Sequence, residues 1–64
     1  MKRGLLLKHL IGNDCVLRRE GTNHSIYRNL KNGLQTSVPR HPDVVEKTAF
    51  DICKQLGIPK PKIN

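Results

Sequence analysis

The sequence predicts an α+β fold, a two-layer α-β-β-β-α sandwich in which a three-stranded antiparallel sheet carries both helices on one face. Segments with apolar residues at helical spacing lie near both ends of the chain, and three short strand-like segments separated by turn residues lie between them. The chain has 64 residues, which suffice for one domain with a small core. We expect residues 1–58 to form this domain and residues 59–64 to form a flexible tail.

The first helix is expected over residues 2–12, with Lys8 and His9 on its polar side. Gly12 and Asn13 should end it, because both residue types tolerate the left-handed conformation that terminates a helix. The apolar residues that recur at helical spacing, and that we expect to face the sheet, are Leu6, Leu7, Leu10 and Ile11.

Three strands are expected over residues 15–19, 23–28 and 34–38. The first and third alternate between apolar and polar side chains, as strands with one buried face do, and the second is built on Ile26 and Tyr27. The opposite face of the sheet should be left to water or to a partner.

Turn residues separate these strands. Glu20-Gly21 follows the first strand, and residues 29–33 close a hairpin in which the pair Asn32-Gly33 is a strong turn signal. Pro39 should end the third strand, because proline cannot donate a hydrogen bond to a neighbouring strand.

The second helix should begin near Thr48, because Thr48 followed three residues later by Asp51 resembles a capping box. Gly57 should end it, and the prolines beyond prevent any continuation. The apolar residues that recur at helical spacing there are Val45, Ala49, Ile52, Cys53 and Leu56.

The charge of the chain favours a polyanionic partner. Twelve Lys and Arg against five Asp and Glu give a formal net charge of +7, which attracts phosphate backbones regardless of sequence. With one Tyr, one Phe and no Trp, a platform that stacks several bases is hard to build, so backbone contacts remain. The candidate phosphate-binding residues are Arg18, Arg19, Arg28 and Arg40.

The sequence indicates no membrane, metal or cofactor site. Its longest apolar runs are far shorter than the ~20 residues that span a bilayer, so we expect a soluble cytoplasmic protein. The histidines and cysteines lack the spacings typical of zinc sites. Cys15 and Cys53 lie within apolar stretches and are expected to be buried, reduced thiols.

His24 is the residue that could carry chemistry, since it follows a glycine turn and lies between arginines in the sequence. RNA supplies its own nucleophile in the 2′-hydroxyl, so cleavage needs a proton-transfer group active near neutral pH and cations to stabilise the developing charge. Histidine, with an ordinary pKa of ~6.5, fits the first need and arginine the second. His41, in a proline-bounded loop, could touch the substrate or shape the site, whereas His9 is expected to be solvated.

Four motifs, in this order, resemble the HicA (YcfA-like) toxin family. They are LLKHL at residues 6–10, RREGTNHSIY at 18–27, VPRH at 38–41 and TAFDICKQLGI at 48–58. The resemblance implies a fold like that of double-stranded-RNA-binding domains and an mRNA interferase activity. It also implies that the protein is the toxin of a bacterial type II toxin–antitoxin system and is neutralised by a HicB-like antitoxin.

The resemblance places the family's catalytic histidine, in its Gly-x-x-His motif, on His24. It implies a single catalytic histidine and no cofactor, and one titrating group predicts activity that falls on one side of neutrality. The chain departs from the family pattern at Gly4, Cys15, Thr22 and Lys47, none of which replaces the histidine.

Two other functions remain compatible with the sequence. One is a non-catalytic double-stranded-RNA-binding module of the same fold, although residues 48–51 lack the lysines expected of such a module at the start of its last helix. The other is a protein-interaction domain whose charge complements an acidic partner.

Overall fold

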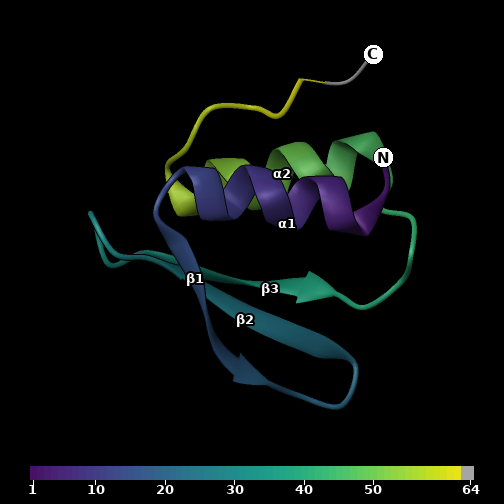
Figure 1. The fold of residues 1–64 in the computed structure, drawn as a ribbon, viewed down its shortest axis with the longest axis horizontal. Coiled ribbons are helices and arrows are strands. Elements are labelled where there is room, and N and C mark those ends of the chain that lie inside the picture. The colour runs from purple at the N-terminus through teal and green to yellow at the C-terminus, as the bar shows by residue number, and fades with distance from the viewer. Residues whose placement is uncertain (63–64) are drawn as a thin grey trace.

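Two helices and three strands follow one another in the predicted order (Figure 1). The structure is a computed structural model that describes residues 1–62. Its elements are α1 (Arg3–Gly12), β1 (Cys15–Glu20), β2 (His24–Asn29), β3 (Gln35–Pro39) and α2 (Glu46–Leu56). The predicted α+β sandwich is confirmed, and the strands differ from the predicted ranges by at most one residue at either end. Within residues 1–62, neither helix is long and apolar enough to cross a membrane.

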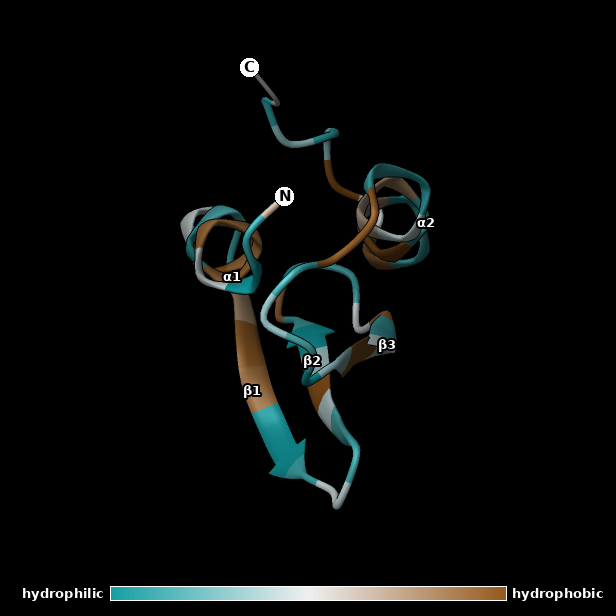
Figure 2. Cartoon of the chain, turned by 90° about the vertical axis from the view of Figure 1, so that its right-hand side faces the viewer, coloured by the Kyte–Doolittle hydropathy of each residue, from teal (hydrophilic) through white to brown (hydrophobic). Residues whose placement is uncertain are grey.

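The strands form one antiparallel sheet in the order β1-β2-β3. Both helices lie on the same side of this sheet, α1 over β1 and α2 over β3 (Figure 2). We call the opposite side, which neither helix covers, the open face. This two-layer arrangement buries one face of the sheet and leaves the other exposed.

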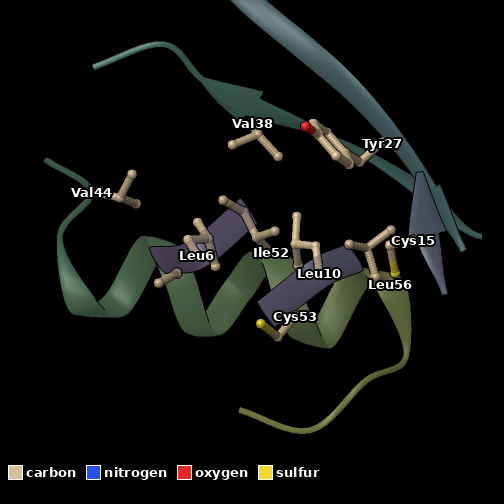
Figure 3. Packing of buried hydrophobic residues seen from close by; sticks show 10 residues of the cluster. Leu6, Leu10, Cys15, Tyr27, Val38, Val44, Ile52, Cys53 and Leu56 are labelled. Atoms are coloured by element: carbon tan, nitrogen blue, oxygen red, sulfur yellow. The ribbon is translucent and has the colours of Figure 1, made fainter. Parts of the chain in front are cut away.

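The core lies between the helices and the sheet (Figure 3). Leu6 and Leu10 of α1 and Leu56 of α2 are fully buried, as is Val38 of β3, and Tyr27 of β2 is nearly so. Because the helices are short, a single apolar stripe on each of them supplies most of this core. Burial of such side chains is the dominant stabilising contribution in a domain of this size.

Two residues predicted to face the core are instead exposed. Ile11 is 62% exposed, because Leu6 and Leu10, one turn apart, define the inward line of α1 and Ile11 lies about 100° further round the helix. Val45 is 67% exposed, because it has an extended conformation and precedes the first turn of α2.

The capping box predicted for α2 is wrong. The helix begins at Glu46, with Val45 as its N-cap residue and no side chain capping it. The Asp51 carboxylate points outward and forms an ion pair with Lys47, with 3.1 Å between Oδ2 and Nζ. Thr48 therefore lies inside the first turn of the helix.

The ends of the two helices differ from each other. Gly57 has a φ of +70° and ends α2 as predicted, with the Ile58 amide donating to the Cys53 carbonyl at 3.0 Å. At the end of α1, the left-handed residue is Asp14 and not the predicted Gly12 or Asn13. Asn13 contributes through its side-chain amide, which donates to the His9 carbonyl at 2.9 Å.

The first residues of the predicted tail lie against the helices. The His9 ring bonds to the Pro59 carbonyl at 2.8 Å, the Lys60 ammonium lies 4.9 Å from the centre of the Phe50 ring, and Pro61 is buried. Residues 59–61 therefore make defined contacts with the domain, whereas residues 63–64 of the predicted tail lie outside the described residues.

Candidate functional site

His24, the first residue of β2, lies on the open face. Ser25, Tyr27 and Asn29 are buried beneath the helices, and successive side chains of a strand point to opposite faces. His24 and Ile26 consequently point away from the core, and His24 is exposed to solvent.

A small hollow of about 280 Å³ brings His24 together with the loop that follows β3. Pro39, the last residue of β3, is the direct partner of His24 in the sheet, so the chain leaves β3 beside the histidine. We call this feature the histidine hollow. Its lining residues are Thr22, Asn23, His24, Pro39, Arg40, His41 and Pro42. Three of the six predicted site residues, His24, Arg40 and His41, are therefore brought into one place.

The turn before β2 fixes where His24 begins the strand. The Gly21 amide donates a hydrogen bond of 2.7 Å to the His24 carbonyl, which closes a tight connection through Thr22 and Asn23. A Cβ atom on residue 21 would lie 3.0 Å from the His24 carbonyl oxygen. Glycine therefore permits a close approach of two backbones at the residue that carries the candidate chemistry.

Arg3 joins the loop after β3 to the strand that carries His24. Its Nε donates to the Pro39 carbonyl at 2.8 Å, and its Nη2 donates to the Ser25 hydroxyl at 2.9 Å. Its backbone amide donates to the Pro42 carbonyl, also at 2.8 Å. Sequence reasoning missed Arg3, because its partners lie 22 or more residues away and no local pattern marks them.

Glu20 and Arg40 form an ion pair at the rim of the hollow. Arg40 Nη2 lies 2.6 Å from Glu20 Oε2, while the Ser25 hydroxyl donates to the other carboxylate oxygen. Both charged side chains are about half exposed, and an exposed ion pair contributes only about 0–1 kcal/mol to stability. Arg40 is therefore engaged with Glu20 but could exchange that partner for a phosphate at little cost.

A second hollow, of about 340 Å³, lies on the open face and is lined by Arg18, Arg19, Ile26 and Gln35. The register of β1 against β2 shifts between Leu17 and Arg19, so Arg18 is the extra residue of a β-bulge. Adjacent strand residues normally point to opposite faces, whereas here the two arginines line the same hollow. We call it the arginine hollow.

The two hollows are neighbours. Ile26, which lines the arginine hollow, lies two residues along β2 from His24 on the same face, a distance of about 7 Å. Among residues 1–62, neither Arg18 nor Arg19 forms an ion pair. The open face thus places unpaired cations beside the histidine hollow.

Arg28 is not brought to this site. It pairs with Val16 and Gln35 in the sheet and lies four residues along β2 from His24, about 13 Å away. His9, predicted to be solvated on the polar side of the first helix, is half-buried on α1, and its ring makes an exposed hydrogen bond to the Pro59 carbonyl.

Both cysteines are buried and free, as predicted. Burial raises the pKa of the Cys53 thiol to about 11, with a further contribution from Cys15. The pKa of Cys15 is raised by burial and then by the nearby Asp14 carboxylate. Since the thiolate is the reactive form, these shifts favour a packing role over a nucleophilic one.

Two larger hollows, of about 750 and 520 Å³, lie on the helical side of the molecule beside the C-terminal segment. Neither contains His24, His41 or any of the four candidate arginines. In the part of the chain that the structure describes, no three histidine, cysteine or acidic side chains are grouped as metal ligands would be.

Comparisons of the chain with protein-family models, with curated proteins and with solved structures found no match.

Proposed function

We propose that this protein is an endoribonuclease that cleaves mRNA, with His24 transferring a proton at the scissile phosphate. The observation that carries the proposal is the position of His24, exposed in a hollow and flanked on the same face by the unpaired Arg18 and Arg19. This combination provides an imidazole that can transfer a proton and cations that offset phosphate charge.

The substrate supplies the rest of the chemistry. The 2′-hydroxyl of RNA attacks the adjacent phosphorus, so the protein has to move protons and stabilise the negative charge that develops on the phosphate oxygens. The solvent-accessible hollow, with a volume of about 280 Å³, is large enough to admit a phosphate and its ribose. Neither a metal ion nor an organic cofactor is part of this mechanism.

We further propose that the protein is the toxin of a type II toxin–antitoxin pair, acting in the bacterial cytoplasm and neutralised by a HicB-like antitoxin. The resemblance of its motifs to HicA toxins supports this assignment, as does the net charge of +7, which favours an acidic inhibitor. The open face, left uncovered by the helices, offers such an inhibitor direct access to His24.

The charges of α2 do not favour the alternative, a non-catalytic double-stranded-RNA-binding module. The first turn of α2 contains Glu46, and the ammonium of Lys47 is paired with Asp51. A phosphate approaching this end of the helix would meet carboxylates as well as a lysine.

Expression of the wild type and of His24→Ala in a bacterium tests the proposal. We expect the wild type to arrest growth with loss of mRNA and His24→Ala to be harmless at equal protein level, with co-expression of an acidic protein encoded beside the toxin restoring growth. Growth arrest that persists in His24→Ala would contradict the catalytic role. A harmless wild type that binds RNA without cutting it would favour the binding module.

A further inference from the structure

Two of the three histidines of the chain line the same hollow. His24 lies at the start of β2 and His41 lies two residues beyond Pro39, the sheet partner of His24. The third histidine, His9, lies on α1 and bonds to the Pro59 carbonyl. Residues 24 and 41 are far apart in the sequence, so their convergence is a property of the fold.

The loop that carries His41 is held at both of its ends. Proline occupies residues 39 and 42, which restricts the backbone, and the carbonyls of both prolines accept hydrogen bonds from Arg3. Beyond the loop, the Val44 amide donates to the Met1 carbonyl at 2.8 Å. Such support from surrounding hydrogen bonds is what a residue needs in order to act at a fixed distance from a second group.

The same support extends to His24. Arg3 also donates to the hydroxyl of Ser25, the next residue after His24. One guanidinium therefore fixes the loop of His41 and the strand of His24 relative to each other. Two histidines that line one open hollow can both reach a single phosphodiester group bound there.

The charges around the hollow are mixed. Arg40 is compensated by Glu20, and Asp43 forms a backbone bridge with Lys2 on the neighbouring segment. The charged side chains on the segments around the two histidines are Lys2, Arg3, Glu20, Arg40 and Asp43, and Arg18 and Arg19 line the neighbouring arginine hollow. The amino terminus of Met1 bonds to the Val44 carbonyl. The surroundings of the two histidines therefore combine cations that can attract a phosphate with the carboxylates of Glu20 and Asp43.

We propose that His41 is a second catalytic residue and that His24 and His41 act as a general base and general acid pair. This inference rests on the proposed ribonuclease function and replaces its single proton-transfer group with two. The neutral histidine accepts the proton of the 2′-hydroxyl as the bond from O2′ to phosphorus forms. The protonated histidine donates a proton to O5′ as the bond from phosphorus to O5′ breaks.

The reaction balances without any co-reactant. Its products are a 2′,3′-cyclic phosphate and a 5′-hydroxyl end, and the two histidines finish with their protonation states exchanged. Because one histidine must be neutral and the other protonated, activity depends on both titrations. The pair predicts cleavage that falls at acid and at alkaline pH, whereas a single group predicts a fall on one side only.

The test compares wild type, His24→Ala, His41→Ala and His9→Ala. A bond cleaved by the wild type is first mapped in an mRNA, and an oligoribonucleotide is then synthesised with sulfur in place of the bridging 5′-oxygen at that bond. A thiolate leaves without protonation, so this substrate bypasses the general acid. We expect His24→Ala and His41→Ala each to cleave the normal substrate about 10²- to 10⁴-fold more slowly than the wild type. The cleavage rate of His9→Ala should be close to that of the wild type.

On the sulfur substrate, we expect either His24→Ala or His41→Ala to recover nearly full activity and the other variant to stay slow. The variant that recovers has lost the general acid, and the variant that stays slow has lost the general base. If an active wild type were matched by His41→Ala, or if neither variant recovered, the pair would be refuted while the role of His24 could stand. A wild type that cleaves no RNA would refute the proposed function and the pair together.

Discussion

Arg3 Nη2 donates a hydrogen bond of 2.9 Å to the Ser25 hydroxyl, which joins the first turn of α1 to the residue after His24. The same guanidinium holds the Pro39 carbonyl through its Nε. The planar fork of arginine suits such paired contacts, which a lysine ammonium cannot reproduce in the same geometry. Arg3 is therefore a positioning residue for the histidine hollow.

Arg3→Lys tests this role. We expect the turnover of RNA to fall about 10- to 100-fold and the free energy of unfolding to fall by about 1–2 kcal/mol, with RNA affinity nearly unchanged because the charge is kept. Single-turnover cleavage, RNA binding and urea unfolding measure the three quantities. Arg28→Lys, the same substitution away from the hollow, is the control. A variant that loses stability but keeps its turnover would show that Arg3 is only structural.

Gly21→Ala should disturb His24 directly. The new Cβ would lie 3.0 Å from the His24 carbonyl oxygen, so the start of β2 has to shift by a few tenths of an ångström. We expect slower cleavage and a loss of about 1 kcal/mol in stability. Gly4→Ala is the matched control, since its Cβ would meet nothing within 4 Å and should stabilise α1 by up to ~1 kcal/mol. Equal activity of the two variants would contradict this account of the turn.

The double substitution Arg18→Ala and Arg19→Ala should weaken RNA binding mainly by removing cations that bind phosphates. For single-stranded RNA, the slope of log affinity against log salt should flatten by about 0.7 for each phosphate that the variant no longer neutralises. Lys47→Ala with Lys54→Ala removes the same charge from α2, on the other side of the sheet. Salt titrations of both double variants measure the difference. If the slope flattens equally in both, RNA does not bind preferentially at the arginine hollow.

The buried Cys53 thiol predicts a loss of stability in alkali. Its pKa is raised from its ordinary value of 9.0 to about 11, so between these values the folded state binds a proton that the unfolded state has released. Stability is therefore fully present below pH 9 and falls by about 1.4 kcal/mol per pH unit above it. Urea unfolding under reducing conditions should show this slope in the wild type and a shallower one in Cys53→Ala. Equal slopes of stability against pH in the two proteins would contradict the assignment of this loss to the Cys53 thiol.

Local patterns predicted most of the fold. The order of elements follows from apolar spacing, and Gly57 ends α2 as its sequence context indicates. The start of α2 was mispredicted because Thr48 and Asp51 match a capping pattern, whereas the Asp51 carboxylate pairs with Lys47. A capping contact with Thr48 and an ion pair with Lys47 are both local interactions of similar strength for Asp51. The sequence alone does not show which of the two forms.

The site was predicted less completely than the fold. The Gly-x-x-His pattern identified His24 as a candidate, and the proline-bounded loop drew attention to His41. The bulge that turns Arg18 and Arg19 toward one hollow has no local signature, because it depends on how β1 aligns with β2. The contacts of Arg3 are likewise tertiary, so no periodicity or motif could indicate them.

The most direct measurement is the cleavage of a purified mRNA by the wild type and by His24→Ala, prepared in parallel and assayed in EDTA. The proposed function predicts fragments ending in 2′,3′-cyclic phosphate with the wild type and a rate at least ~10²-fold lower with the variant. Cleavage by His24→Ala at the wild-type rate, or a wild type that EDTA inactivates, would contradict the proposal that His24 transfers the proton in a metal-free reaction.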